Sequence, residues 1–259
     1  MSYQQFAYLY DRLMNDVPYD KWVELVKKAV SDYKVNGANL LDLACGTGEL
    51  SIRFSQAGFR VTGVDLSEDM LSVAQAKTIE AGEGVFYLEQ DMSRLEGLPV
   101  FDLVCICCDS INYLRTEEDV INTFKGVHEH LDENGLFIFD VHSLYKMNQL
   151  FINQTYAVND EDLSLIWQCY EGENPNSVEH DLSFFELDEE SGMYHRYDEL
   201  HFQRTYSVEQ YSEWLDLTGF SVVKVEADFS EGIEDHAERI FFYCKKKEMI
   251  KSKTLDLVQ

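Results

Sequence analysis

The chain has 259 residues, 45% of them hydrophobic, which suits one large domain, or a domain with an insertion, whose core needs no disulfides. It has 21 Lys and Arg against 48 Asp and Glu, a formal net charge of −27. Such a surface repels phosphate polyanions and anionic lipid, which argues against bulk nucleic acid or a membrane face as partners. The first residues are too polar for a signal peptide, and no run approaches the ~20 apolar residues of a membrane span, so we expect a cytoplasmic protein.

The six cysteines form no CxxC pair, so we expect neither a disulfide framework nor a metal site. Three of them lie in Cys105-Ile-Cys107-Cys108, within an apolar run. Here we expect a buried strand in a reducing compartment, in which Cys is a small apolar residue. Strand alternation would place Cys105 and Cys107 on one face of the sheet and Cys108 on the other.

In the first half of the chain, short apolar runs alternate with amphipathic stretches. The expected strands are residues 40–44, 60–66, 85–89, 101–108 and 136–141, and the expected helices are 49–57, 67–82 and 116–131. Ser67 and Thr116 are predicted N-caps, because acidic residues follow each of them. Asn134-Gly135 is the predicted stop after the last helix. This alternation indicates a parallel sheet with helices on both faces.

The pattern changes after about residue 145. Residues 156–205 alternate polar with apolar or aromatic side chains and predict about three antiparallel strands. A helix at 207–218 and strands at 221–226 and 239–245 follow. We therefore predict an α/β fold with a doubly wound, mostly parallel seven-stranded sheet and an antiparallel β insertion. The predicted domains are 1–145 plus 207–247 for cofactor binding, an inserted lid or substrate subdomain at 150–206, and a tail at 248–259.

A glycine turn, Gly46-Thr47-Gly48, joins the first strand to the first helix. Glycine lets a backbone approach a ligand closely, and the helix that follows offers free N–H groups. Asp42 lies in the first strand, Asp65 ends the second and Asp91 ends the third. In an open parallel sheet these positions line one crevice at the carboxyl edge, where ligands bind.

The crevice fits a cationic nucleoside better than a dinucleotide. The dinucleotide fingerprint GxGxxG needs a third glycine, but Ser51 stands there, and the loop holds no Lys or Arg for a pyrophosphate. S-adenosylmethionine has no phosphate and carries an ammonium and a sulfonium. We expect Asp42 to hold its ammonium through the loop, Asp65 its ribose and Asp91 its adenine amine.

The chain resembles class I S-adenosylmethionine-dependent methyltransferases over roughly residues 35–142, through LDLACGTGEL, VTGVDLSEDM, YLEQDMSRL and FDLVCICCDSINYL. FAYLYDRLMNDVPYDKW and the insertion are similar to a bacterial branch that acts on small molecules. By position, the resemblance assigns the cofactor to Tyr10, Asp42, Ala44, Gly46, Gly48, Asp65, Leu66, Met70, Asp91, Met92, Cys107 and Cys108. Where many enzymes that methylate nucleobases or glutamine have an Asn/Asp-Pro-Pro-aromatic box, this chain has Cys108-Asp109-Ser110-Ile111-Asn112-Tyr113, which argues against those substrates.

The sequence gives weaker signals for the residues that bind the methyl acceptor. Methyl transfer is an in-line displacement that mainly needs alignment, and a general base is needed only if the acceptor must lose a proton. No catalytic residue is assigned. The expected substrate-binding residues are Asp109, Asn112, Tyr113, His142, Trp167 and Arg204, and His201 and Tyr206 are further lid candidates.

We therefore predict methyl transfer to a small-molecule acceptor. The alternatives are a cofactor-binding sensor without turnover, an NAD-dependent oxidoreductase and, ranked low, an aminopropyl transferase. The sequence leaves open the acceptor, its reacting atom, the use of a base and the oligomeric state, with a homodimer as one option.

Overall fold

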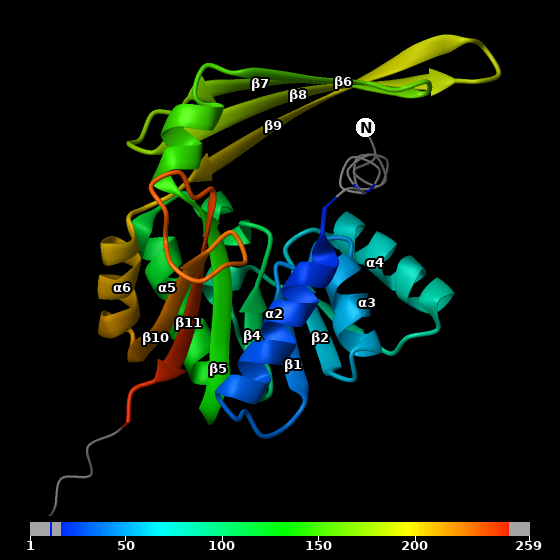
Figure 1. Cartoon of the computed structure of the whole chain (residues 1–259). Helices are drawn as coiled ribbons and strands as arrows, with labels where there is room; N and C mark the ends of the chain where they lie inside the picture. The colour runs from blue at the N-terminus through cyan, green and yellow to red at the C-terminus, as the bar shows by residue number, and fades with distance from the viewer. Residues whose placement is uncertain (1–10, 12–16, 249–259) are drawn as a thin grey trace, which may run out of the picture.

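The apolar runs form a seven-stranded sheet in the computed structural model, which describes residues 11 and 17–248 (Figure 1). Its strands are β1 (Asn39–Leu43), β2 (Arg60–Asp65), β3 (Phe86–Glu89), β4 (Phe101–Ile106), β5 (Leu131–His142), β10 (Phe220–Ala227) and β11 (Arg239–Lys246). Their order is β10-β11-β5-β4-β1-β2-β3. The neighbours among β1 to β5 pair in parallel, and β11 runs antiparallel to both β5 and β10. The predicted fold class is confirmed.

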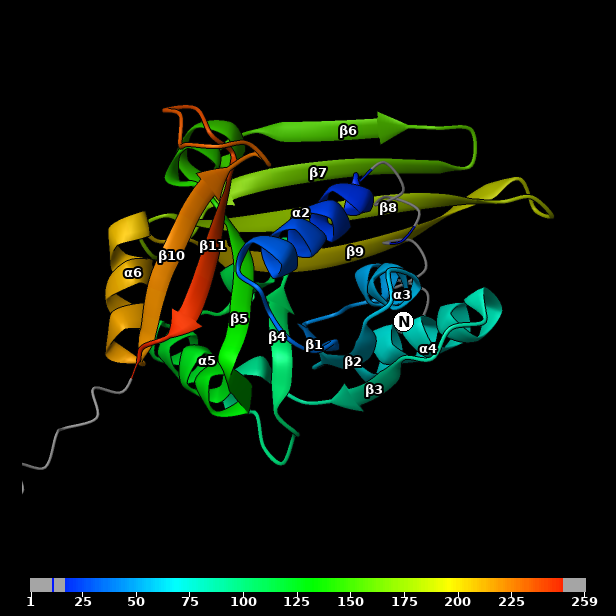
Figure 2. The ribbon, with the colours of Figure 1, turned by 60° about the horizontal axis from the view of Figure 1, so that its bottom comes forward.

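Helices cover both faces of this sheet (Figure 2). They are α2 (Tyr19–Asp32), α3 (Glu49–Gln56), α4 (Glu68–Ala81), α5 (Glu117–His130) and α6 (Val208–Leu217). One apolar cluster joins α2 and α3 to the side chains of Leu40 and Leu103, and a second joins α5 and α6 to those of Leu41 and Val104. Because alternate strand residues point to opposite faces, each strand contributes to both clusters. No described helix is long and apolar enough to cross a membrane.

The helix starts follow the predicted caps, whereas one helix end does not. Ser67 Oγ accepts a hydrogen bond from Met70 N at 3.3 Å, and Thr116 Oγ1 accepts one from Asp119 N at 3.1 Å. The predicted stop at Asn134-Gly135 is wrong, because α5 ends at His130 and β5 begins at once. Leu131 is 1% exposed and pairs with Phe101 of β4, so burial in the sheet overrides helical continuation.

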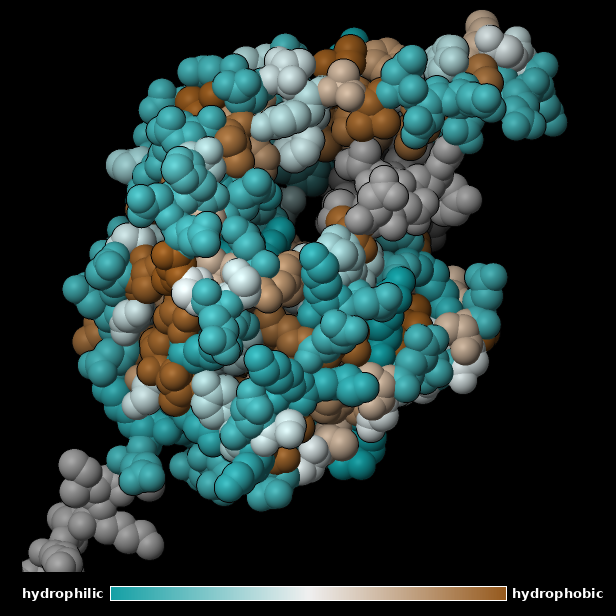
Figure 3. Space-filling view, viewed as in Figure 1, coloured by the Kyte–Doolittle hydropathy of each residue, from teal (hydrophilic) through white to brown (hydrophobic). Residues whose placement is uncertain are grey.

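A second sheet is inserted between β5 and α6. Its strands are β6 (Thr155–Asn159), β7 (Leu163–Glu171), β8 (Ser177–Asp188) and β9 (Met193–Arg204), all antiparallel and in that order. There are four strands where the sequence predicted about three. The π-helical turn η3 (Lys146–Phe151) leads into the sheet, which lies across the top of the large sheet in Figure 1. Hydrophilic residues dominate the face shown in Figure 3, consistent with the acidic composition.

The cysteine prediction holds for two of three residues. Cys105 and Cys107 lie in one buried cluster on the α2 side of the sheet. Cys108, predicted on the opposite face, packs against that same cluster. It follows the end of β4 and has a φ of 54°, so the alternation of an extended strand no longer applies to it.

Candidate active site

The candidate site lies at the carboxyl ends of β1 and β4, which are neighbours in the large sheet. These neighbouring strands lead into connections on opposite sides of the sheet, and such a switch point is where open α/β sheets bind ligands. A cavity of about 910 Å³ lies there and extends to the inserted sheet, from which it takes His201. Among the predicted site residues, those that line it are Asp42, Ala44, Gly46, Asp65, Leu66, Met70, Asp91, Met92, Cys107, Cys108 and Tyr113.

The two glycines of the turn do different things. Both have positive φ, 54° for Gly46 and 78° for Gly48. A Cβ at Gly46 would meet no atom of the described residues within 4 Å, and Gly46 lines the cavity. A Cβ at Gly48 would stand 2.5 Å from Tyr87 Oη and 2.9 Å from Ala74 Cβ. Gly48 therefore lies outside the lining and permits close packing at the start of α3.

Ser51 replaces the third glycine of the dinucleotide pattern, and its hydroxyl has a partner. Ser51 Oγ donates to Asp42 Oδ2 at 2.5 Å, and both residues are buried. Burial raises the pKa of Asp42 to about 6 although this hydrogen bond lowers it. A buried carboxylate with a single donor among the described residues is a strong acceptor for a cationic ligand group.

Asp65 fixes the loop around the cavity. Its Oδ2 accepts a hydrogen bond from Gly46 N at 2.8 Å, and its Oδ1 accepts one from Ser67 N at 2.9 Å. Burial raises its pKa, while these N–H groups oppose the shift. A carboxylate offers about four lone-pair sites, so two remain for ligand hydroxyls.

The third carboxylate of the motif closes the turn after β3. Asp91 Oδ1 accepts from both Ser93 N and Ser93 Oγ, each at 2.8 Å. No described residue gives Asp91 Oδ2 a hydrogen bond, and Asp91 and Met92 both line the cavity. An acceptor oxygen beside an apolar side chain suits the edge and face of a purine ring.

The charge of the cavity wall tests the fit to a cationic nucleoside. Among the described residues, the lining holds seven carboxylates and two guanidinium groups, those of Arg94 and Arg115. Lys77 already neutralises Glu49, with Nζ 2.6 Å from its carboxylate. Because charges in a partly enclosed site are screened less than on the surface, the remaining excess favours ammonium and sulfonium groups over phosphate. The residues therefore fit S-adenosylmethionine.

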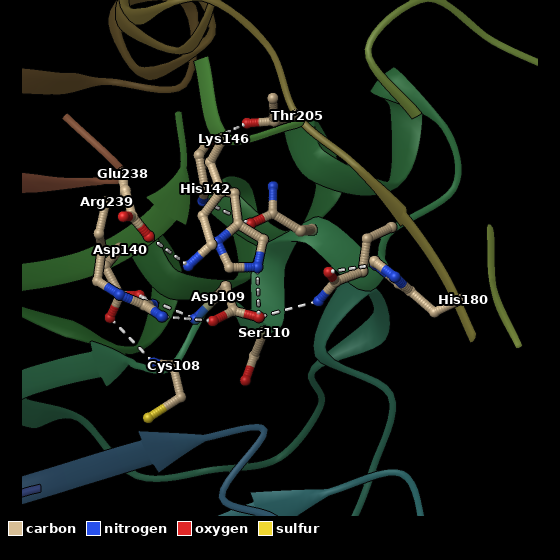
Figure 4. Close-up of polar contacts among 12 residues, drawn as sticks. Cys108, Asp109, Ser110, Asp140, His142, Lys146, His180, Thr205, Glu238 and Arg239 are labelled. Carbon is tan, nitrogen blue, oxygen red and sulfur yellow. Dashed lines mark hydrogen bonds and ion pairs between the residues drawn. The ribbon is translucent and has the colours of Figure 1, made fainter. Parts of the chain in front are cut away.

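Beyond the cavity floor, Asp109 is the centre of a buried polar network (Figure 4). It accepts hydrogen bonds from Arg239 Nη2 at 2.8 Å and Gln203 Nε2 at 2.9 Å, and His142 Nε2 lies 3.2 Å away. Burial alone would raise the pKa of Asp109, but His142 and Arg239 hold it well below its usual range. Asp109 is therefore ionised and fully engaged by protein groups.

Asp140 holds the turn that carries Asp109. Cys108 and Asp109 both have left-handed backbones, with φ of 54° and 55°. Their N–H groups donate to the Asp140 carboxylate at 2.9 and 2.8 Å, and Trp22 Nε1 and Arg239 Nη1 also donate to it. Consecutive left-handed residues cost free energy, so this 1%-exposed carboxylate stabilises a strained segment of the cavity floor.

Of the other predicted substrate residues, Tyr113 lines the cavity, whereas Asn112, His142, Trp167 and Arg204 lie outside the lining. Asn112 bridges two elements, accepting from His142 N at 2.9 Å and donating to the Arg204 carbonyl at 2.8 Å. Trp167 Nε1 donates to His180 Nδ1 at 3.0 Å. The acceptor roles of Asp109, Asn112, His142, Trp167 and Arg204, and the cofactor role of Gly48, stay predictions. Tyr10 lies outside the described residues.

Several lining residues were not predicted, among them Tyr19, Ser110, Arg115 and Asp119. Ser110 Oγ donates to the Cys107 carbonyl at 2.8 Å, and the Arg115 guanidinium lies 5.5 Å from the Phe202 ring centroid. Of these, only Ser110 had a signal in the sequence, because it closely follows the end of the predicted strand 101–108. His201, weighed only as a lid candidate, reaches the cavity and faces the Tyr113 ring at 5.9 Å between centroids.

The comparisons with known proteins agree with this geometry. A family model described as "Methyltransferase domain" matches residues 40–135. A Geobacillus protein provisionally named a methyltransferase is 48% identical over 248 residues, covering 95% of this chain and 100% of that protein. YqeM of Bacillus subtilis, also provisionally named a methyltransferase, is 46% identical over 254 residues, covering 97% of this chain and 100% of that protein. A crystal structure of an S-adenosylmethionine-dependent methyltransferase from Clostridium acetobutylicum has a TM-score of 0.86 and 33% identity, covering 96% of this chain and 100% of that one.

The chain belongs to the class I S-adenosylmethionine-dependent methyltransferases. This methyltransferase uses S-adenosyl-L-methionine as its cofactor. The sequence predicts this cofactor because the crevice is acidic and its loop holds no Lys or Arg for a phosphate. The dinucleotide, aminopropyl-transfer and turnover-free alternatives are therefore replaced by an enzyme that transfers a methyl group to an acceptor. Among the described residues, no group of three His, Cys, Asp or Glu side chains could hold a metal ion.

Proposed function

We propose that this methyltransferase acts on a small-molecule acceptor that lies under the inserted sheet. The observation that carries the proposal is the continuity of the cavity, which runs from Asp42 and Asp65 to Tyr113 and His201. Because His201 of the inserted sheet borders the cavity at this end, we expect the sheet to leave room for a small molecule and to obstruct a polymer. The net charge of −27 further disfavours a nucleic acid.

The cofactor end supplies binding and orientation. We propose that Asp42 holds the ammonium through the loop, Asp65 the ribose hydroxyls, and Asp91 with Met92 the adenine, with Leu66, Met70 and the Cys107–Cys108 segment packing beside them. The cofactor supplies an electrophilic methyl group when bound. Alignment of an acceptor with that group contributes several kcal/mol, up to about 7–11 in ideal models, so no obligatory catalytic base is needed.

The acceptor end offers aromatic walls and a neutral imidazole. Tyr113 and His201 form an edge-to-face pair, and burial lowers the pKa of His201. An imidazole that is neutral near pH 7 can accept a hydrogen bond or a proton from an acceptor N–H or O–H group. We propose these two side chains as the walls of the acceptor site.

Calorimetry with S-adenosylhomocysteine tests the cofactor end. Asp65→Ala removes the carboxylate that binds Gly46 N and Ser67 N, so we expect its Kd to rise by about 100-fold, or about 2.7 kcal/mol. Glu80→Gln, an exposed change on α4, is the matched control and should bind like the parent. Unaltered binding by Asp65→Ala would contradict the proposed ribose site.

Release of S-adenosylhomocysteine tests the acceptor class. The enzyme is incubated with cofactor and either the low-molecular-mass or the macromolecular fraction of a bacterial extract. We expect turnover with the first fraction and none with the second. Turnover that depends only on protein or RNA would overturn the small-molecule proposal.

A further inference from the structure

Three consecutive residues, the last two of β9 and the one that follows it, hydrogen-bond the inserted sheet to the core. Gln203 Nε2 donates to Asp109 Oδ2 at 2.9 Å, and the Arg204 carbonyl accepts from Asn112 Nδ2 at 2.8 Å. Thr205 Oγ1 donates to the His142 carbonyl at 2.6 Å. Only the first of these bonds uses a side chain of β9, and only its partner, Asp109, is a charged group.

Gln203 is also the end of a hydrogen-bond chain that crosses the inserted sheet. Trp167 Nε1 on β7 donates to His180 Nδ1 on β8, which requires the neutral tautomer with the proton on Nε2. His180 Nε2 then donates to Gln203 Oε1 at 3.1 Å on β9. Burial lowers the pKa of His180 to about 4, so the ring is neutral at neutral pH and Nδ1 is free to accept the bond from Trp167.

The hydrogen bonds therefore all donate in one direction, from Trp167 toward Asp109. Because Gln203 accepts at its carbonyl oxygen and donates from its amide nitrogen, neither Glu nor Leu can replace it without losing a bond. Arg239 and Asp140 anchor the other end, with Arg239 bridging the two carboxylates in the interior (Figure 4). The inserted sheet is thus registered against the same turn whose flanking residues, Cys108 and Ser110, line the cavity.

This junction lies two residues from the acceptor wall. Alternate residues of a strand point to the same face, so His201 and Gln203 share the inner face of β9. The register agrees, because His201 pairs with His180 and Gln203 with Val178, both buried. A shift of the Gln203 anchor would move His201 relative to Tyr113.

We propose that Gln203 and Asp109 form a positioning pair that sets His201 at the acceptor wall of the cavity. Neither residue touches the acceptor, and both act through the placement of β9. The role given to His201 rests on the proposed function. The fixed register of β9 does not, because it is a property of the protein alone.

Histidine NMR of the full chain, with S-adenosylhomocysteine bound, tests the pair without an acceptor. In Gln203→Leu, β9 loses its anchor and the His201 ring becomes more solvated, so its titration midpoint should rise toward about 6.5. The ring of His195, on the same face of β9 and 57% exposed, is the internal control and should titrate as in the parent. Ser183→Ala, which removes bonds on the exposed face of the sheet, should leave both rings unchanged.

Exchanging the donor and the acceptor between positions 203 and 109 tests whether the His201 signal can be restored. In Gln203→Glu two carboxylates face each other, so they share a proton at low pH and repel at high pH. The His201 signal should then be parent-like near pH 5 and displaced near pH 8. Adding Asp109→Asn restores one donor and one carboxylate, and it should return His201 toward the parent across this range. A merely structural loss would give neither the pH dependence nor the rescue.

Two results would overturn the proposal. One is a His201 titration in Gln203→Leu that matches the parent. The other is a loss of S-adenosylhomocysteine affinity as large as that of Asp65→Ala, because a pair acting on the acceptor wall should change that Kd by less than about threefold. If Gln203→Leu fails to fold, Gln203→Asn, which is one methylene too short to span the gap, replaces it. Failure to find a small acceptor would be a separate result and would leave this measurement intact.

Discussion

The two ends of the cavity are held by hydrogen bonds of very different reach along the chain. At the cofactor end, Asp42 meets Ser51 nine residues away, and Asp65 meets Gly46 nineteen residues away. At the acceptor end, Asp109 meets Gln203 across 94 residues and Arg239 across 130. The cofactor end is therefore a local motif, whereas the acceptor end exists only once the insertion and the last strand have returned to the sheet.

The largest loss of stability is expected from a change at the Asp140 carboxylate, which supports the turn between the two ends of the cavity. Asp140→Asn removes a buried negative charge from Arg239 and weakens the support of the Cys108–Asp109 turn. Breaking a buried ion pair costs about 3–5 kcal/mol, so the free energy of unfolding should fall by that amount in urea titrations. Asp102→Asn is the control, because its carboxylate accepts from Asn39 N at a partly buried site, and we expect a loss near 1 kcal/mol. Equal losses in the two variants would show that the Asp140 carboxylate contributes no more to stability than an ordinary hydrogen bond does.

The two glycines sharpen the contrast within the cofactor end. Gly48→Ala places a methyl group against Tyr87 and Ala74 at positive φ, so thermal unfolding should show a loss of about 2–4 kcal/mol. Gly46→Ala meets open space and should cost only about 1 kcal/mol of backbone strain. Its methyl group borders the cavity, however, so it should weaken S-adenosylhomocysteine binding more than stability. The reverse ranking would mean that the loop does not contact the cofactor.

The pH dependence of stability isolates Asp42. Its pKa is about 6 in the folded protein and about 3.9 when unfolded, so the native state binds more protons between these values. The protonated form is the stable one, so its contribution is fully present below about pH 4 and is lost as the pH rises through about 6. That loss amounts to about 3 kcal/mol. Urea titrations across this range should show it in the parent and not in Asp42→Asn, and parallel curves would refute the burial effect.

The smallest effect is expected far from the core, within the inserted sheet. Trp167→Phe removes the donor to His180 Nδ1 and leaves the Cys169 thiol, 3.3 Å away, as the remaining partner. We expect a loss of about 1 kcal/mol in urea titrations. Tyr170→Phe, on the same strand with an exposed side chain, should be neutral. A Trp167→Phe loss as large as that of Asp140→Asn would show that the two sheets unfold as one unit.

The sequence alone predicts what short-range chemistry determines. Apolar runs located the large sheet, and Ser67 and Thr116 located helix starts because a cap needs only the residues that follow it. The start of β5 was predicted at residue 136 and lies at Leu131, because Leu131 pairs with Phe101, thirty residues earlier. Cys108 was placed on the opposite face because no local signal announces its left-handed backbone.

The same limit explains the candidate site. Asp42, Asp65 and Asp91 follow strand ends in a recognisable order, and all three line the cavity. Asp109 and His142 also lie at strand ends and were expected to face the acceptor, but they lie against each other, and Asp109 also binds Arg239 and Gln203. Only the folded arrangement shows that these charges are already matched. Strand position therefore identified the polar residues without showing which of them had protein partners.

Anchorage through Gln203, Arg204 and Thr205 has a consequence for protein engineering. Because these three consecutive residues carry the bonds to the core, a chimera could exchange most of the preceding strands while retaining them and their partners Asp109, Asn112 and His142. The inserted sheet is in this sense an interchangeable part, and new acceptor preferences are best sought by grafting sheets onto this unchanged core.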